Sequence, residues 1–278
     1  YYMLEDDAYT SNPQSYFMGG SAIIQNYSGA GESEAIFGQF SYRFAEDWSL
    51  TLGARSTEED KEGFKEYVGI ISASGEGSFD DTTSTFILEH DYSENTNIYF
   101  KVAEGFKAGG FNAESSNPFA ASTPYAPETI ESTELGLKGR YLDNRMMLNI
   151  AYFDNEHEDM QISYFNADAA AASEVINQSA SISGLEVESM TMLNDSTVLT
   201  LNFSTLDAET TGNKRAQDGF LVNNIPYSPE KTLYASLEKD FGSYRVRLDH
   251  TRVDEHASFP YNSQDFRTEL TYIDTNSK

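Results

Sequence analysis

Residues 97–153 decide how this sequence folds. They begin with Asn97-Ile-Tyr-Phe-Lys-Val-Ala-Glu-Gly-Phe-Lys-Ala-Gly-Gly-Phe-Asn112, and a Ser-, Asn-, Pro- and Ala-containing segment follows. The chain then reads Tyr125-Ala-Pro-Glu-Thr-Ile-Glu-Ser-Thr-Glu-Leu-Gly-Leu-Lys-Gly-Arg-Tyr141 and ends the stretch with residues 145–153. Apolar residues alternate with other residues in each part, and a period of two indicates a strand with two different faces. The stretch therefore predicts strand, long loop, strand, tight turn and strand.

The same alternation recurs along the rest of the chain. It is clear in residues 33–44, 48–55, 81–92, 174–192, 199–203, 233–238 and 244–249, and weaker strands are expected at residues 1–8 and 266–272. The polar stretches between them, residues 9–31, 57–80, 206–228 and 254–264, read as loops. The expected fold is all-β, an antiparallel up-and-down meander of about 12 strands.

The predicted connections alternate between short and long. Short turns are expected near Glu46, Glu94, Asp143, Asp195 and Gly242, and long loops near Gly20, Lys65, Pro118, Ala170, Gln217 and Phe259. This rhythm is typical of outer-membrane barrels, which have short periplasmic turns and long outer loops. Aromatic residues crowd the short turns, as a girdle at the lipid boundary would require; they are Phe44, Trp48, Tyr92, Tyr141, Phe241 and Tyr244.

The polar faces of the predicted strands carry charges of both signs. The basic members are Arg43, Arg55, Lys138, Arg140, Arg245, Arg247 and Arg267, and the acidic members are Glu89, Asp91, Glu134, Glu186, Glu188 and Glu269. Charges on neighbouring strands can pair across a wet lumen, whereas a basic residue facing lipid costs about 2–4 kcal/mol near the middle of the membrane. The pattern therefore predicts a large transmembrane barrel with apolar side chains outward and charges inward.

Composition narrows the class of protein further. The chain has 278 residues and no cysteine, which excludes disulfides and thiolate metal sites within it. Its net charge of −27 disfavours nucleic acid as a partner. No run reaches the roughly 20 apolar residues that a membrane helix needs. A β-barrel escapes that test, because only alternate residues face lipid.

Several motifs resemble the barrel of TonB-dependent outer-membrane receptors. Gly105-Phe-Lys-Ala-Gly-Gly-Phe-Asn112, Tyr125-x-Pro-Glu128, Glu134-Leu-Gly-Leu-Lys138 and the turn at Asp143 are similar to its middle. Ile36-Phe-Gly-Gln-Phe40 with Leu50-Thr-Leu-Gly-Ala-Arg55 is similar to an earlier hairpin, and Ser183-Gly-Leu-Glu-Val-Glu188 and Asn224-Ile-Pro-Tyr-Ser-Pro229 to later ones. Together they cover about residues 32–238 in family order.

The resemblance implies both an architecture and a function. Plugged outer-membrane transporters have barrels of about 22 strands, so residues 1–278 are expected to be a partial barrel that lacks the N-terminal plug and the TonB box. We expect an open trough with bare edges at residues 1–8 and 266–272. The implied function is active uptake of a scarce, bulky nutrient across the outer membrane of a Gram-negative cell. The implied partners are the TonB complex, outer-membrane lipid, lipopolysaccharide and a ligand. A ferric siderophore is the default ligand; cobalamin, haem and glycans stay open.

Candidate site residues come from the predicted loops. Phe106, Phe111 and Asn112 are expected near the outer vestibule, although the glycines around them also serve to bend the strand. Loop aromatics could stack on a ligand or simply pack the loop; they are Phe111, Phe119, Tyr125, Tyr164, Phe165 and Tyr227. No catalytic constellation and no cofactor are indicated. His157 lies among Glu156, Glu158 and Asp159, but a solvated acidic loop explains this cluster better than a cation site.

Three other functions stay open from the sequence. A passive porin or adhesin barrel would share the strand pattern and lack the plug. A soluble secreted β-domain that binds glycans would be a stable monomer without detergent. A lipase or protease barrel has no support from spacing, since there is no Gly-x-Ser-x-Gly turn.

Overall fold

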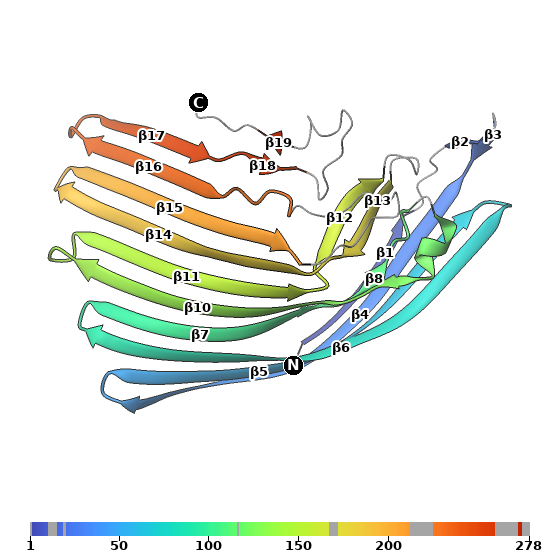
Figure 1. Cartoon of the computed structure of the whole chain (residues 1–278), viewed down its shortest axis with the longest axis horizontal. Coiled ribbons are helices and arrows are strands. Elements are labelled where there is room, and N and C mark those ends of the chain that lie inside the picture. Colours follow the sequence, from blue (N-terminus) through green and yellow to red (C-terminus); the bar gives the residue numbers. More distant parts are fainter. Residues whose placement is uncertain are drawn as a thin grey trace.

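An antiparallel sheet of 11 strands forms the body of the molecule (Figure 1). The computed structural model describes residues 2–10, 16–18, 21–115, 117–166, 172–211, 225–258 and 272–273. The strand order is β1-β4-β5-β6-β7-β10-β11-β14-β15-β16-β17, so each strand of the sheet lies beside the preceding and following strands of the same sheet. The predicted all-β, up-and-down meander is confirmed.

The sheet strands are long, and shorter elements lie between them. The sheet contains β1 (Tyr2–Thr10), β4 (Gln25–Ala45), β5 (Trp48–Tyr67), β6 (Ile71–Ser93), β7 (Thr96–Lys107), β10 (Glu128–Tyr141), β11 (Met146–Glu158), β14 (Ala180–Asn194), β15 (Thr197–Thr210), β16 (Lys231–Asp240) and β17 (Arg245–Val253). Four small pairs are β2 (Tyr16–Met18) with β3 (Ser21–Ile23), β8 (Gly110–Phe111) with β9 (Pro124–Tyr125), β12 (Gln161–Asn166) with β13 (Ala172–Asn177), and β18 (His256–Ala257) with β19 (Tyr272–Ile273). A 3₁₀ turn, η1, spans Pro118–Ala121. Within the described ranges, no helix is long and apolar enough to cross a membrane.

The five short turns lie where the sequence predicts them. They join β4 to β5, β6 to β7, β10 to β11, β14 to β15, and β16 to β17, all at one end of the sheet (Figure 1). The turn between β10 and β11 has three consecutive residues at positive φ, Leu142 at 57°, Asp143 at 55° and Asn144 at 65°. The side chain of Arg145 then donates to the carbonyl oxygens of Met192 (2.8 Å from Nη2) and Leu193, which ties this turn to its neighbour.

Several predicted loops are strands in the structure. Residues 57–67 and 71–80 extend β5 and β6, which are joined by a turn at residues 68–70, so the long loop expected near Lys65 is wrong. The alternation of short and long connections fails at that point. Residues 25–31, 154–158 and 206–210 also belong to strands, and the strand expected over residues 174–192 is divided between β13 and β14.

The ladder register separates the two faces of the sheet as predicted. Leu135 is opposite Phe100 and Tyr152, and Leu137 is opposite Ile98 and Ile150. The same outward face carries, strand after strand, a band of apolar residues: Phe40, Tyr42, Leu50, Leu52, Phe86, Leu88, Leu148, Val187, Leu201, Phe203, Leu233, Leu237, Val246 and Leu248. Leu135 is 55% exposed and Leu248 is 66% exposed, which rules out a sealed apolar interior between two layers.

The opposite face carries charged side chains. Lys101, Glu134, Lys138, Glu186, Glu188 and Arg247 all lie on it by register. Lys101 pairs with Glu134 on the neighbouring strand β10, with 3.7 Å between Nζ and Oε2. Arg43 of β4 reaches past β5 to Asp91 of β6, with 3.0 Å between Nη2 and Oδ2. We call this the inner face, because β8, β12 and β13 lie within the curve of the sheet on this side (Figure 1).

Beyond the apolar band, the outward face becomes acidic. Glu34, Glu58 and Asp80 are directly opposite one another on β4, β5 and β6. Further acids on this face are Glu32, Asp60, Glu62, Glu76, Glu104, Glu131, Asp154, Glu156, Asp207 and Glu209. Like charges in register repel, so this part of the sheet requires water on its outer side. Both faces are polar there, which hides the period of two and explains why the sequence indicated loops.

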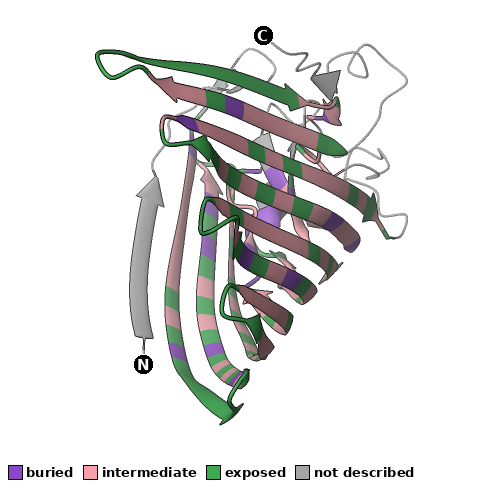
Figure 2. Ribbon diagram, turned by 90° about the vertical axis from the view of Figure 1, so that its left-hand side faces the viewer, coloured by how far each residue is buried: buried purple, intermediate pink, exposed green. Residues whose placement is uncertain are grey.

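Among the described residues, the most deeply buried side chains lie mainly in the inner elements, in the segments that flank them and on the strand ends. The fully or nearly fully buried side chains are Gln25, Lys65, Ser115, Ala121, Glu174, Gln178 and Ala180. Figure 2 shows the sheet itself alternating between exposed and intermediate residues, with few buried positions. One edge of the sheet is β1, as expected, and the other is β17. The predicted last strand lies outside the described residues, except Tyr272 in β19.

Candidate functional site

A loop folded onto the inner face forms one side of the candidate site. The inner loop, residues 108–115 and 117–126, contains β8, η1 and β9. Its Phe111 lies against two glycines of the sheet: a Cβ atom built on Gly63 would be 2.6 Å from Phe111 Cβ, and one on Gly75 would be 2.6 Å from Phe111 Cε1. Ala121 also approaches both glycines through its carbonyl oxygen. These two glycines are the seat of the inner loop, because any side chain there would displace it.

Lys65 attaches the inner loop next to this seat. Its side chain is fully buried, and Nζ donates to the carbonyl oxygen of Ala113 at 2.9 Å. The ammonium also lies 5.9 Å and 5.4 Å from the ring centroids of Tyr27 and Tyr67. Burial lowers the pKa of Lys65 from 10.5 to about 8, although the nearby charges of Glu114 and Glu174 act in the opposite direction.

The inner hairpin, β12 with β13, binds the tip of the inner loop. The side-chain amide of Asn112 donates to the carbonyl oxygen of Val175 at 2.9 Å and accepts from its backbone N–H at 2.7 Å. Close by, the buried hydroxyl of Ser115 donates to the buried carboxylate of Glu174. A buried carboxylate needs such donors, so the tip of the loop and the hairpin stabilise each other.

A second set of hydrogen bonds joins the two segments at their base. Asn177 accepts from the backbone N–H of Ala126 at 2.8 Å and donates back to its carbonyl oxygen at 2.9 Å. Gln161 Nε2 donates to the carbonyl oxygen of Ala108 at 2.8 Å. The inner loop is thus held at both ends by side chains of the inner hairpin or its flanks.

The vestibule pocket lies between the inner loop and the outer ends of β4 and β5, by which we mean the ends of the strands remote from the short turns. Its volume is about 610 Å³, and it is lined by Arg55, Glu59, Lys61, Glu62, Lys107, Phe111, Tyr125 and Gln161, among others. Lys61 Nζ is 2.8 Å from Glu59 Oε2, and the Arg55 guanidinium lies 5.5 Å from the ring centroid of Phe37. The lining holds three cations (Arg55, Lys61 and Lys107), two acids (Glu59 and Glu62) and aromatic side chains, so it has a small excess of positive charge that suits an anion with flat surfaces.

Three of the predicted ligand residues line this pocket: Phe106, Phe111 and Tyr125. Tyr125 is half-buried, and burial raises the pKa of its hydroxyl. Phe111 is committed to the glycine seat. Phe106 is opposite Thr129 in the ladder, which places it in the outward-facing set with Phe100 and Val102. Tyr125 is therefore the aromatic candidate that the pocket supports best.

The other predicted ligand residues lie elsewhere or are occupied. Asn112 binds the inner hairpin, and Phe119 is 59% exposed in η1. Tyr227 is exposed and has a positive φ of 59°. Its ring centroid lies 6.0 Å from that of His256, near the β17 edge of the sheet. Tyr164 and Phe165 lie in β12, but their side chains are outside the described part of the structure.

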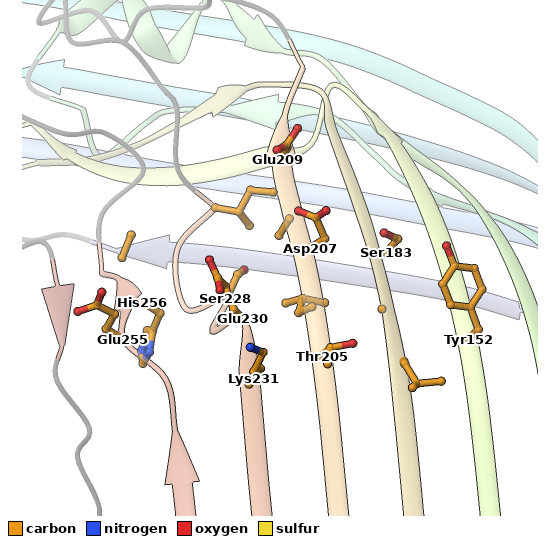
Figure 3. A pocket seen from close by; sticks show the side chains of 16 residues that line it. Tyr152, Ser183, Thr205, Asp207, Glu209, Ser228, Glu230, Lys231, Glu255 and His256 are labelled. Atoms are coloured by element: carbon orange, nitrogen blue, oxygen red, sulfur yellow. The ribbon is translucent and has the colours of Figure 1, made fainter.

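Figure 3 shows a second hollow, which we call the rim pocket. It has a volume of about 660 Å³, and its labelled side chains include Tyr152, Thr205, Asp207, Glu209 and Glu230. Thr205 is opposite Leu185 and Asp207 is opposite Ser183, which are outward positions of the ladder. The rim pocket therefore opens on the outward face of the sheet, opposite to the inner face.

Sequence reasoning missed the charged residues that line the wall of the vestibule. Lys61, which lines the pocket, and Lys65 beside it fall in the stretch predicted to be loop, because that stretch has no alternation of apolar and polar residues. Their spacing of four puts both on one face once the strand is known. His157 Nδ1 lies 3.1 Å from Glu128 Oε1, whereas Glu156 belongs to the outward face. Within the described residues, no group of three or more His, Asp or Glu side chains is arranged to hold a metal ion.

The lowered pKa of Lys65 predicts that the seating of the inner loop depends on pH. With the loop seated, Lys65 loses its proton near pH 8 rather than 10.5. Between these values the released form binds more protons, so the seated form gains stability as the pH rises. We expect amide protection of the inner loop, corrected for intrinsic exchange rates, to increase between about pH 7 and about pH 9.5. Lys65→Met should abolish this increase, and Lys61→Met should keep it; a decrease with pH would contradict the assignment.

Comparison with known proteins places this architecture in a family. A family model described as TonB dependent receptor-like, beta-barrel matches residues 1–276. The ferric yersiniabactin uptake receptor FyuA from Yersinia pestis is similar with a TM-score of 0.75 at 17% identity, over 99% of this chain and 40% of that one.

Two further solved structures show the same fold. The siderophore receptor PiuA from Acinetobacter baumannii has a TM-score of 0.67 at 17% identity, over 83% of this chain and 34% of that one. The ferric citrate transporter FecA has a TM-score of 0.68 at 16% identity, over 92% of this chain and 38% of that one. The chain spans 40% or less of the length of these three receptors.

Proposed function

The chain belongs to the TonB-dependent receptor-like β-barrel family, and on that premise we propose that it forms part of an outer-membrane receptor that takes up a scarce, bulky nutrient. We propose a ferric siderophore as the nutrient and TonB as the source of drive. In this proposal residues 1–278 contribute barrel wall, and the plug and the TonB-binding segment are supplied by chain outside them. The role is transport rather than catalysis, in keeping with relatives that are named as uptake receptors and transporters.

The two faces of the sheet support a location in the outer membrane of a Gram-negative cell. The apolar band faces lipid, and the short turns with Phe44, Trp48, Tyr92, Tyr141, Phe241 and Tyr244 lie at the periplasmic boundary. Trp48 stacks on His90 with ring centroids 4.3 Å apart, and Phe241 stacks on Tyr244 at 4.8 Å. The acidic outward surface beyond the band then faces the lipopolysaccharide layer.

The vestibule pocket is the observation that carries the choice of ligand. Arg55, Lys61 and Lys107 outnumber the two acids Glu59 and Glu62 there, in a chain of net charge −27. An anionic ligand would otherwise be repelled by the acidic surface, so a local group of cations favours an anionic ferric chelate over neutral cobalamin. Tyr125 adds an aromatic surface on which a catechol-like or similarly flat group can stack.

A matched pair of lysines on β7 tests the choice of ligand. Lys107 lines the vestibule pocket, whereas Lys101 lies on the same face lower in the lumen, 3.7 Å from Glu134. A lost hydrogen bond to a charged group weakens binding by about 10-fold or more, so we expect Lys107→Met to lower affinity for an anionic ferric tris-catecholate by that factor. The measurement is binding of radiolabelled iron complexes to outer membranes.

The controls separate charge from folding. Lys101→Met should bind the anionic complex like the wild type, and a neutral ferric tris-hydroxamate should show no difference between the two variants.

Loss of uptake when the gene or tonB is deleted, on one iron source at a time, tests the transport role itself. Growth that is unaffected on every iron source would overturn iron uptake, and uptake that continues without TonB would favour a passive barrel.

A further inference from the structure

The inner loop and the inner hairpin bury polar groups against each other and against the wall of the sheet. Ser115, Glu174 and Ala121 are at most 1% exposed, and Ile162 of the hairpin is 5% exposed. Separating the loop from the hairpin would leave the Glu174 carboxylate without the Ser115 hydroxyl and expose the paired groups of Asn112 and Asn177. Breaking these contacts one at a time is more costly than moving both segments together.

The contact with the wall is of a different kind. It includes the Phe111 ring on Gly63 and Gly75, the approach of Ala121 to the same glycines, and the Phe79 ring against Gly109. Two hydrogen bonds add to these contacts, one from the buried Lys65 to the loop and one from the backbone N–H of Gln161 to the Glu128 carboxylate at 3.0 Å. The lowered pKa of Lys65 shows that burying its charge opposes this attachment. The joint between loop and hairpin is thus rich in matched hydrogen bonds, whereas the joint with the wall combines ring contacts on glycines with two hydrogen bonds, one of them from a buried charge.

We propose that the inner loop and the inner hairpin form a single lid over the vestibule pocket, and that this lid leaves the glycine seat as one unit. The lid leaves room in the pocket beneath it, since Phe111, Ala113, Tyr125 and Gln161 line the pocket from the lid side. A bulky ligand reaches Arg55 and Lys61 when the unit lifts. The biological meaning rests on the proposed transport function, but the movement itself does not.

Thiol labelling tests whether the two segments move together. The chain has no cysteine, so Ala121→Cys reports on the loop and Ile162→Cys reports on the hairpin, each in a separate variant of the receptor in outer membranes. Gly63→Ala places a methyl group where the Phe111 side chain lies and should open the lid. An extra methyl group in a filled site moves the equilibrium between closed and open lid by about 10-fold or more. We therefore expect maleimide labelling of both reporters to speed up by that same factor.

The control is the glycine paired with Gly63 in the ladder. A Cβ on Gly29 would be 3.6 Å from the carbonyl oxygen of Glu62, an ordinary contact, so Gly29→Ala should leave both labelling rates unchanged. Phe111→Ala removes the side chain that fills the seat and gives a second opening variant should Gly63→Ala fail to reach the membrane. Faster labelling of Ala121→Cys with no change at Ile162→Cys would overturn the single lid, as would no change at either.

The outcome is independent of the proposed ligand. Labelling rates are measured without any iron complex, so a failed lid leaves the uptake results standing. Conversely, a lid that opens as one unit in a protein that takes up no iron would preserve the movement and overturn only the assigned nutrient.

Discussion

Ile150→Arg is expected to destabilise the barrel in a lipid bilayer by about 2–4 kcal/mol, because the change puts a guanidinium near the middle of the lipid-facing band. Ile150 lies opposite Leu137 on one side and Val187 on the other, and all three belong to the apolar outward set. The two residues opposite position 150, Leu137 and Val187, offer the long arginine side chain no carboxylate. Reversible urea unfolding in phospholipid vesicles measures the difference, and the amount of folded receptor in the outer membrane should fall in parallel.

Asn149→Arg is the matched control for this prediction. Asn149 is the adjacent residue of β11 but faces the lumen, and its side-chain amide donates to Glu188 at 3.3 Å. An arginine at this position meets a carboxylate and water, so we expect a change of less than about 1 kcal/mol. Equal destabilisation by the two variants would mean that both faces meet the same solvent, and the membrane assignment would fail.

The separation of faces was predictable because it is local. A strand alternates its side chains whatever its neighbours are, so Leu135 and Lys138 were placed on opposite faces from sequence alone. The short turns were predictable for a similar reason: each lies between two alternating runs, and polar residues such as Asp143 and Asn144 tolerate the left-handed backbone that the structure shows there.

The outer ends of the strands and the lid were not predictable in the same way. Beyond the apolar band, Glu58 and Lys61 are equally compatible with water, so the sequence retains no contrast between faces there. The lid depends on contacts between residues far apart in sequence, such as Asn112 with Val175 and Lys65 with Ala113. Gly63 and Gly75 appeared as ordinary loop glycines, and only the position of Phe111 shows why a side chain is not tolerated.

Gly136→Ala is expected to destabilise the barrel by about 2–4 kcal/mol, although it adds a single methyl group. Tyr99, the residue directly opposite Gly136 in the ladder, lays its ring where the new Cβ atom would be. The ring would have to leave, which breaks the hydrogen bond from the Tyr99 hydroxyl to Glu134. It would also leave Lys138, whose Nζ lies 5.1 Å from the ring centroid.

A double-mutant cycle tests this explanation directly. In a Tyr99→Ala background the space above Gly136 is empty, so Gly136→Ala should then have almost no effect on the free energy of unfolding. Gly53→Ala on the same inner face is the control for glycine itself, since its Cβ would meet Thr85 Cβ at an ordinary 3.6 Å. If Gly136→Ala were as harmful without the Tyr99 ring as with it, the glycine would be needed for its backbone, and the pairing of ring and glycine would not be what stabilises this part of the wall.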